Sequence, residues 1–152
     1  MSNKLLALKL VLNALGVGTN IDDVTARKEK QKAIYLAKAL AGLDLGYSYG
    51  WYIRGPYSPS LANDYYELQN ESLEEGTLRQ DLIQSLEGIR TTVLESPLKP
   101  PQLDRPDWLE LLASWHYLIN VSRYNIENAT TKLNEQKPHV APYIQAAIRV
   151  LG

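Results

Sequence analysis

Apolar residues recur every three or four positions through most of this 152-residue sequence. That period matches one face of an α-helix and not a strand, in which every second residue points the same way. The spacing predicts seven helices, which cover residues 4–15, 22–41, 59–69, 78–93, 104–119, 122–133 and 140–151. The expected fold class is therefore mainly α, a compact bundle of about six to seven helices.

Several helices carry a recognisable start signal. Ser58 followed by Pro59 predicts a helix start, because serine accepts the unpaired N–H groups and proline is tolerated in the first turn. Thr77 with Gln80 predicts a capping box. Ser122 is expected to cap the helix that reaches residue 133. Further starts are expected at Asp22 or Asp23 and at Asp104 with Pro106.

Residues 43–60 differ from the rest of the chain in their pattern. Strand-forming tyrosines and a tryptophan lie between glycines, and the aromatic run ends in Gly55-Pro56. β-Propensity with this punctuation predicts a short β-hairpin or extended element around residues 46–55.

The chain is expected to form one globular domain over residues 1–152, with a Pro-rich connector at 96–106. Its 45% hydrophobic and 22% charged residues are an ordinary globular balance. The absence of cysteine excludes disulfides and Cys-ligated zinc. Lys4 and Lys9 interrupt the N-terminal apolar run, which does not resemble a signal peptide. We expect a cytoplasmic protein that does not enter the membrane.

Charge is distributed unevenly, although the net charge is only −1. Residues 25–39 hold five bases and one acid, whereas residues 64–95 hold eight acids and two bases. Two interpretations are open: two solvated helix faces, or a surface with one basic and one acidic side. On the second interpretation, the candidate contacts to phosphate or an acidic partner are Arg27, Lys28, Lys30 and Lys32.

The sequence offers little material for catalysis. It has two histidines, His116 and His139, and contains no nucleotide-binding loop, nucleophile elbow or zinc-protease motif. We expect His116 to be a hydrogen-bonded, partly buried residue and His139 to lie at the surface. The sequence predicts no catalytic residue, no metal site and no cofactor, and therefore a protein that is not an enzyme.

Seven aromatic residues lie between positions 47 and 66, while the whole chain has no phenylalanine. These residues can form a core in which tyrosine replaces phenylalanine. They can also form a recognition surface, since Tyr, Trp and Arg are common anchors of binding hot spots. The candidate partner-binding residues are Tyr49, Trp51, Tyr52, Arg54 and Tyr57.

Four segments carry a family resemblance: residues 31–37 (QKAIYLA), 47–61 (YSYGWYIRGPYSPSL) and 111–118 (LLASWHYL), and Lys137-Pro138. Together they resemble small bacterial and archaeal proteins of the YwgA-like kind. They are more distantly similar to the Panacea (SocA-like) antitoxin domain. The resemblance implies a mainly helical domain with a small β element, in a toxin–antitoxin or anti-phage setting. It carries over no catalytic residue.

Three functions remain open. The first is a non-enzymatic regulatory module that binds another protein, such as a toxin or a defence component. The second is a winged-helix-like DNA-binding transcriptional regulator, which the net charge of −1 disfavours. The third is an enzyme of unrecognised chemistry. A homodimer is a further expectation, because the Leu-rich N-terminal helix is expected to need more cover than one small domain supplies.

Overall fold

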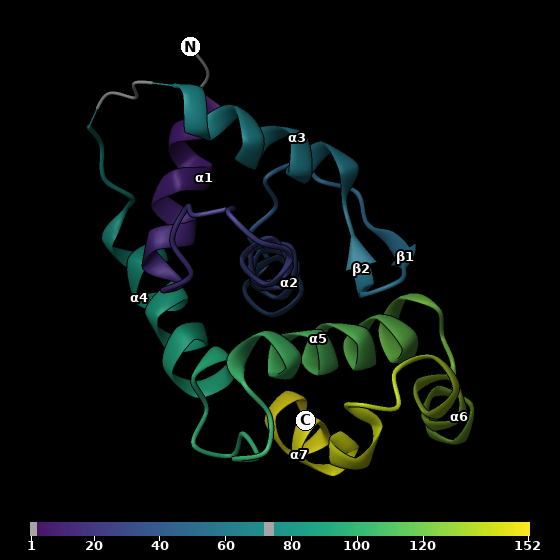
Figure 1. Ribbon diagram of the computed structural model, residues 1–152. Helices are drawn as coiled ribbons and strands as arrows, with labels where there is room; N and C mark the ends of the chain where they lie inside the picture. Colours follow the sequence, from purple (N-terminus) through teal and green to yellow (C-terminus); the bar gives the residue numbers. More distant parts are fainter. Residues whose placement is uncertain (1–2, 72–74) are drawn as a thin grey trace.

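The computed structural model describes residues 3–71 and 75–152; Glu74 of the acidic stretch lies outside them. Within this part the chain forms seven α-helices and one antiparallel hairpin, which confirms the predicted mainly α fold (Figure 1). The helices are α1 (Asn3–Ala14), α2 (Val24–Ala41), α3 (Pro59–Glu67), α4 (Gln80–Ile89), α5 (Arg105–His116), α6 (Ile126–Gln136) and α7 (Ile144–Leu151). The hairpin consists of β1 (Gly50–Tyr52) and β2 (Gly55–Tyr57).

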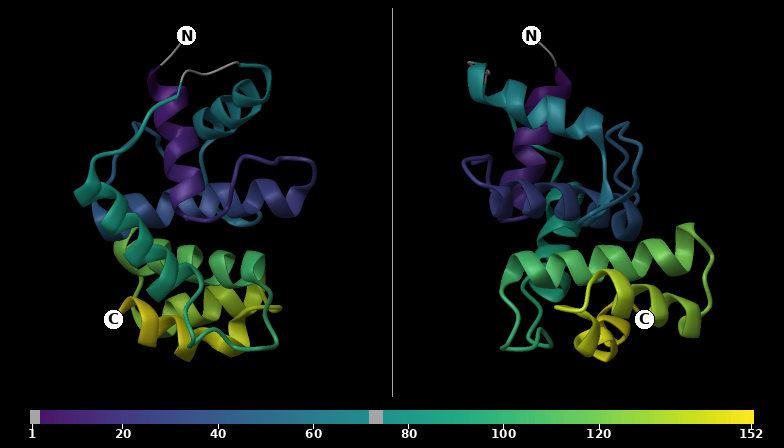
Figure 2. Two further views of the ribbon diagram at one scale, coloured as in Figure 1. Left: turned by 90° about the vertical axis from the view of Figure 1, so that its left-hand side faces the viewer. Right: turned by 45° about the vertical axis from the view of Figure 1, so that its right-hand side comes forward.

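Helix α2 is the central element of the molecule. It is seen end-on in the middle of Figure 1, with α1, α3, the hairpin and α5 around it. The two views of Figure 2 show two layers, one with α1, α2, α3 and the hairpin and the other with α5, α6 and α7. Helix α5 packs on α2 with one side and on α7 with the other. Because α2 is enclosed in this way, a continuous run of eight residues, 30–37, is buried.

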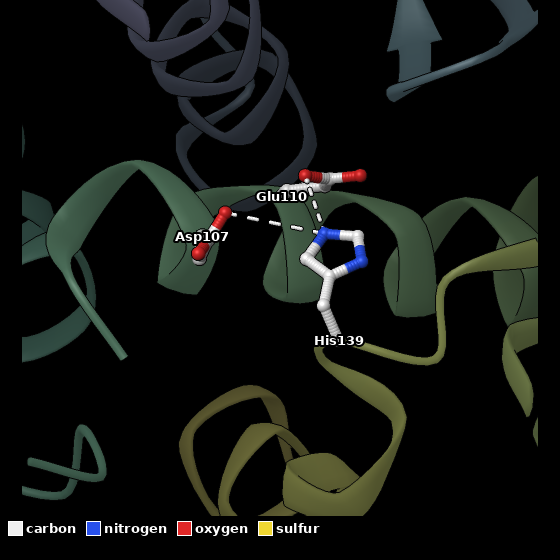
Figure 3. Close-up of side chains that lie close together, drawn as sticks. All are labelled: Asp107, Glu110 and His139. Atoms are coloured by element: carbon white, nitrogen blue, oxygen red, sulfur yellow. Dashed lines mark hydrogen bonds and ion pairs between the residues drawn. The ribbon is translucent and has the colours of Figure 1, made fainter. Parts of the chain in front are cut away.

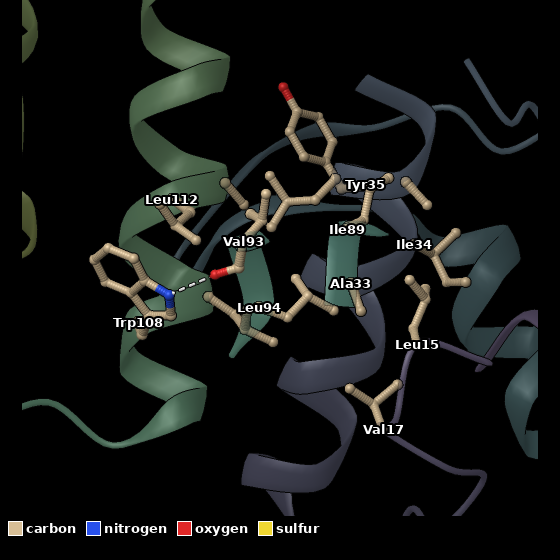
Figure 4. Packing of buried hydrophobic residues seen from close by; sticks show 14 of the residues in the cluster. Leu15, Val17, Ala33, Ile34, Tyr35, Ile89, Val93, Leu94, Trp108 and Leu112 are labelled. Carbon is tan, nitrogen blue, oxygen red and sulfur yellow. Dashed lines mark hydrogen bonds between the residues drawn. The ribbon is translucent and has the colours of Figure 1, made fainter. Parts of the chain in front are cut away.

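The hydrophobic core lies between α2 and its neighbours (Figure 4). Ala33 and Ile34 of α2 are buried there, together with Leu15 after α1 and Ile89 at the end of α4. Trp108 of α5 is fully buried, and its indole Nε1–H donates to the Val93 carbonyl at 2.9 Å. Buried residues on both sides of the Pro-rich connector belong to this one cluster.

The hairpin is placed at residues 50–57, slightly later than predicted. Gly50 pairs with Tyr57, and Tyr52 pairs with Gly55, so that Ile53 and Arg54 form a two-residue turn. Immediately after β2, the Ser58 side chain accepts from the Leu61 N–H at 3.2 Å and caps α3. The predicted helix start at Ser58 and Pro59 is confirmed.

Two predicted caps are wrong. Helix α4 begins at Gln80 with Arg79 in the capping position, and no side chain caps it. Helix α6 begins at Ile126, where Asn125 accepts from the Asn128 N–H at 2.7 Å. The chain before α6 is occupied by a π-helical turn at residues 117–121 that continues α5. Ser122 therefore lies at the end of one helix rather than at the start of the next.

The N-terminal helix does not present an open apolar face. Helices α2, α3 and α4 all contact α1, and none of its leucines is exposed. The described part of the chain therefore covers this helix, and a homodimer stays a prediction. Across the described residues, no helix combines the length and the apolar character that a membrane span requires.

Candidate functional site

A cleft of about 350 Å³ opens between α2, α3 and the turn of the hairpin, three elements that lie side by side in Figure 1. We call it the basic cleft. It is lined by Val24, Arg27, Lys28, Gln31, Lys32, Tyr52, Ile53, Arg54, Tyr57, Tyr65 and Tyr66. Four of these residues are cationic and four are tyrosines, and none of the described lining residues is acidic. The cleft therefore combines positive charge with aromatic walls.

The basic cleft brings together two candidate groups that were predicted separately. Three members of each group line it: Arg27, Lys28 and Lys32 from α2, and Tyr52, Arg54 and Tyr57 from the hairpin. The groups are about 25 positions apart in sequence, and only the folding of the hairpin beside α2 makes them neighbours. Lys30, Tyr49 and Trp51 lie elsewhere.

Lys32 lies in the wall of the cleft but is only 1% exposed. Its ammonium donates to the Pro56 carbonyl at 2.6 Å. Burial lowers the pKa of Lys32 to about 7, and the neighbouring cations Lys137, Lys28 and Arg54 act in the same direction against the attraction of Glu110.

Lys30 is equally buried, on another side of α2. Its ammonium donates to the Val17 carbonyl at 3.1 Å, and burial lowers its pKa. The expectation that the bases of residues 25–39 form an exposed face is therefore wrong for Lys30 and Lys32. The segment between α1 and α2 brings the Val17 carbonyl to Lys30, and strand β2 brings the Pro56 carbonyl to Lys32. The helical period of the sequence does not predict either contact.

Beneath the cleft lies a buried charge network centred on Glu110 of α5. Its Oε1 atom accepts from Lys28 at 2.8 Å and its Oε2 atom accepts from Lys137 at 2.9 Å. Burial alone would raise the pKa of this carboxyl, but the hydrogen bonds and charges of the two lysines lower it to about 2. Lys137 also donates to the Ile53 carbonyl at 2.5 Å, so the network holds the turn of the hairpin in place.

Gln31 fixes the other wall of the cleft. Its side-chain amide pairs with the backbone of Ser58 in both directions, since Nε2 donates to the Ser58 carbonyl and Oε1 accepts from the Ser58 N–H, each at 2.9 Å. These two hydrogen bonds tie the start of α3 to α2. The sequence did not identify Gln31 or Glu110 as a site residue, because the partners of both side chains lie far away along the chain.

Asp107, Glu110 and His139 form a cluster whose carboxylate oxygens and imidazole nitrogen lie within 4.8 Å of one another (Figure 3). His139 is half-exposed, and its Nε2 atom lies 3.2 Å from Glu110 Oε1. The Lys28 ammonium already lies 2.9 Å from the Asp107 carboxylate and 2.8 Å from that of Glu110. A metal ion would have to displace this internal cation, so the cluster is an ion-pair network.

A second cavity, of about 290 Å³, surrounds His116 and includes Tyr35, Lys38, Tyr49 and Tyr117 in its lining. The Tyr35 hydroxyl and His116 Nδ1 are hydrogen-bonded at 2.7 Å, and burial lowers the pKa of the imidazole. The described lining contains no carboxylate that could pair with His116 as an acid–base dyad.

The aromatic segment is divided between core and surface. Tyr47 is buried, whereas Tyr52 is half-exposed at the basic cleft. Tyr49 lines the second cavity, and Trp51 donates to Gln136 Oε1 at 2.9 Å beside Tyr117. Some of the tyrosines therefore belong to the core and others line a cleft, and their role as a recognition surface stays a prediction.

Comparison with known proteins finds no relative of this chain, since no family model, no curated protein and no solved structure matches it. The resemblance to YwgA-like proteins and to the Panacea domain stays a prediction.

Proposed function

We propose that this protein is a non-enzymatic regulatory module that binds an acidic segment of another protein in the basic cleft. The observation that carries the proposal is the composition of the cleft, which gathers four cationic side chains and no acid among its described lining residues. A partner that offers Asp or Glu residues is complementary to this surface, and complementary charge supports both specificity and rapid association.

The rim of the cleft supplies the apolar contact that a protein interface needs. Eight large apolar side chains are exposed in the described part of the chain, and four of them line this cleft: Val24, Tyr52, Ile53 and Tyr66. Ile53 is 87% exposed at the tip of the hairpin. Apolar and aromatic anchors next to Arg54 resemble the composition of interface hot spots.

The contact surface is also held rigidly before any partner binds. The carbonyl groups of Ile53 and Pro56 accept hydrogen bonds from Lys137 and Lys32, and both lysines are buried. A turn fixed in this way loses little conformational entropy on binding, which favours affinity.

The family resemblance gives the proposal a setting. On this resemblance, the partner is a toxin or another component of a defence system in the cytoplasm, and the module regulates that partner by binding it. The DNA-binding alternative is less favoured, because Lys30 does not line the cleft and Lys32 is buried in its wall, so neither offers an exposed charge to the backbone of a duplex.

The proposal is tested by photo-crosslinking in the native host. A benzophenone amino acid replaces Ile53, and the crosslinked peptides are identified by mass spectrometry. The expected result is one protein that is crosslinked within a segment rich in Asp and Glu. The partner is then purified, and its affinity is measured against the wild type and against Arg54→Gln.

Arg54→Gln should weaken binding about tenfold or more, because it removes an exposed cation at the contact. Arg149→Gln is the matched control, since Arg149 is an exposed cation on α7, away from the cleft. Equal affinities of the wild type and Arg54→Gln, or crosslinks to a segment without acids, would contradict the proposal. Crosslinks to a second copy of this chain would show a homodimer instead.

A further inference from the structure

We infer that the basic cleft holds a site for a single oxyanion at the wall that Lys32 lines, with the Lys32 ammonium as its counter-charge. The oxyanion is a carboxylate or a phosphate carried on an aromatic or apolar body. The inference rests on the cleft of the proposed function and names the group that a ligand inserts there. Among the described residues, the buried lysines Lys30, Lys32 and Lys137 outnumber the one buried carboxylate, Glu110.

The buried carboxylate that attracts Lys32 belongs to Glu110, and each of its oxygens already accepts from another lysine. Glu110 uses one oxygen for Lys28 and the other for Lys137. Among the described residues Lys32 has no ion pair, and its one hydrogen bond goes to the Pro56 carbonyl. A buried ammonium without a carboxylate partner is costly for a folded protein. An anion bound in the cleft would remove this cost.

Lys32 lines the cleft, although its side chain is only 1% exposed. Arg27 and Arg54 also line it, so an entering oxyanion meets cationic groups from both α2 and the hairpin. The volume of about 350 Å³ falls at the lower end of the range of small-ligand pockets. It accommodates one ring and one anionic group.

The tyrosines determine what carries the oxyanion. The rings of Tyr52 and Tyr57 lie 5.1 Å apart, and those of Tyr65 and Tyr66 lie 5.5 Å apart. These two pairs line the same cleft and offer ring faces and edges against which a flat apolar body can pack. A bare inorganic ion would leave these walls unused.

The charge state of Lys32 gives the site a measurable signature. Its pKa is lowered to about 7 by burial and by Lys137, Lys28 and Arg54, which outweigh the attraction of Glu110. A bound anion stabilises the protonated amine and raises this pKa. Above neutral pH, anion binding should therefore be accompanied by proton uptake, and the affinity should fall as the pH rises.

The test uses 3-phenylpropionate and its neutral isostere 3-phenylpropionamide, with phenyl phosphate as a second anion. Binding is measured by calorimetry at pH 6.5 and pH 8.5, in buffers of different ionisation enthalpy. We expect the wild type to prefer the carboxylate over the amide about tenfold at the lower pH. We also expect the carboxylate to bind on the order of tenfold more weakly at the higher pH, with proton uptake.

Lys32→Met should remove the pH dependence and most of the preference for the carboxylate, and its folding is checked by circular dichroism. Arg54→Gln, at the exposed turn, should weaken the carboxylate and leave the pH dependence in place. Arg149→Gln should bind as the wild type does. Equal binding of carboxylate and amide by the wild type, absence of proton uptake, or no binding of either probe would each overturn the inference, whatever the variants show.

The two proposals fail in different ways. If the probes bind as expected but no acidic partner segment is crosslinked at position 53, the oxyanion site stands and the proposed function fails. If a partner is crosslinked but the carboxylate shows no preference, the rim binds the partner and the oxyanion site fails. Competition between 3-phenylpropionate and the partner would identify a partner side chain as the natural source of the oxyanion. Independent binding would identify a free small molecule.

Discussion

At Gly55 the hairpin lies directly against Ser114 of α5. Its φ of +93° lies in the left-handed region, which residues with a Cβ rarely adopt. A Cβ placed there would overlap the Ser114 hydroxyl and come within 3.7 Å of Lys137. Both the backbone conformation and the space therefore require glycine. The position of the hairpin, and with it one wall of the basic cleft, depends on this residue.

Gly55→Ala should consequently lower the free energy of unfolding by about 2 kcal/mol or more, from backbone strain and overpacking together. Gly88 is the matched control, because it lies inside α4 and a Cβ added there would have no neighbour within 4 Å. Gly88→Ala should raise the stability by up to about 1 kcal/mol through helix propensity. Urea unfolding of the two variants decides the matter. A Gly55→Ala variant as stable as the wild type would mean that the hairpin does not approach α5 in this way.

At the scale of elements, the helices differ in how their first turns are satisfied. Asp104 accepts from the Asp107 N–H at 2.9 Å and caps α5, the helix that carries Glu110. Helix α4 starts at Arg79 with no side-chain cap. An uncapped helix leaves its first N–H groups to water, which weakens the first turn.

The two helix starts give opposite predictions. Asp104→Ala should lower the stability by about 1 kcal/mol, because it removes the cap of α5. Arg79→Ser should raise it by up to about 1 kcal/mol, because serine can accept from the open turn of α4. Thermal unfolding at neutral pH measures both. If Arg79→Ser melts at the wild-type temperature, the start of α4 is already satisfied by other means.

On the scale of the whole molecule, the Glu110 network joins segments that are far apart in sequence. Lys28 comes from α2, Glu110 from α5 and Lys137 from the segment after α6, and Lys137 reaches the hairpin turn as well. Breaking a buried network of this kind is expensive, because each remaining charge loses its partner. The stability of the molecule should therefore depend on pH at both ends of the accessible range.

Glu110 controls the acid side. Its pKa is lowered from an ordinary 4.5 to about 2 in the folded state. Its contribution to stability is present above pH 4.5 and is lost as the pH falls towards 2. On the alkaline side Lys32 gives a pH dependence in the same direction, since its folded pKa of about 7 also lies below its ordinary value of 10.5. The unfolded chain then binds the extra proton, and stability rises between pH 7 and pH 9.

The measurement is urea unfolding at pH 3, 5, 7 and 9. The wild type should gain stability from pH 3 to pH 5 and again from pH 7 to pH 9. Lys32→Met should show a smaller gain in the second interval and an unchanged gain in the first. Lys30 and Lys137 also have lowered pKa values, so part of the alkaline gain should remain. If Lys32→Met gains as much stability as the wild type between pH 7 and pH 9, a group other than Lys32 titrates in this interval.

Much of the fold could be predicted because its signals are local. The start of α3 at Ser58, the cap of α2 at Asp23 and the end of that helix at Gly42 all involve neighbours within a few residues. Two predicted helix starts are wrong. Ser122 follows a π-helical turn, and Thr77 precedes a helix that starts later than its capping pattern predicts. In both cases the spacing of apolar residues predicted a helix correctly, but the first residue of the helix was wrong.

The candidate site could be predicted only in its parts. The aromatic and basic groups were identified from composition, but their meeting in one cleft requires the hairpin to lie beside α2. No sequence pattern indicated that Glu110 is buried. A single acidic residue on a helix is expected to be solvated, and the lysines that pair with Glu110 belong to other segments of the chain.

The sequence by itself determined the helices, the hairpin and the residue types available for binding, because helical period, turn chemistry and composition depend on neighbours along the chain. Tertiary structure alone decided that Lys30 and Lys32 are interior residues and that Arg27 and Arg54 face one cleft. The physical reason is that the burial of a charge depends on which distant carbonyl and carboxylate groups come to meet it. Those groups, at Val17, Pro56 and Glu110, are brought there only when the chain folds.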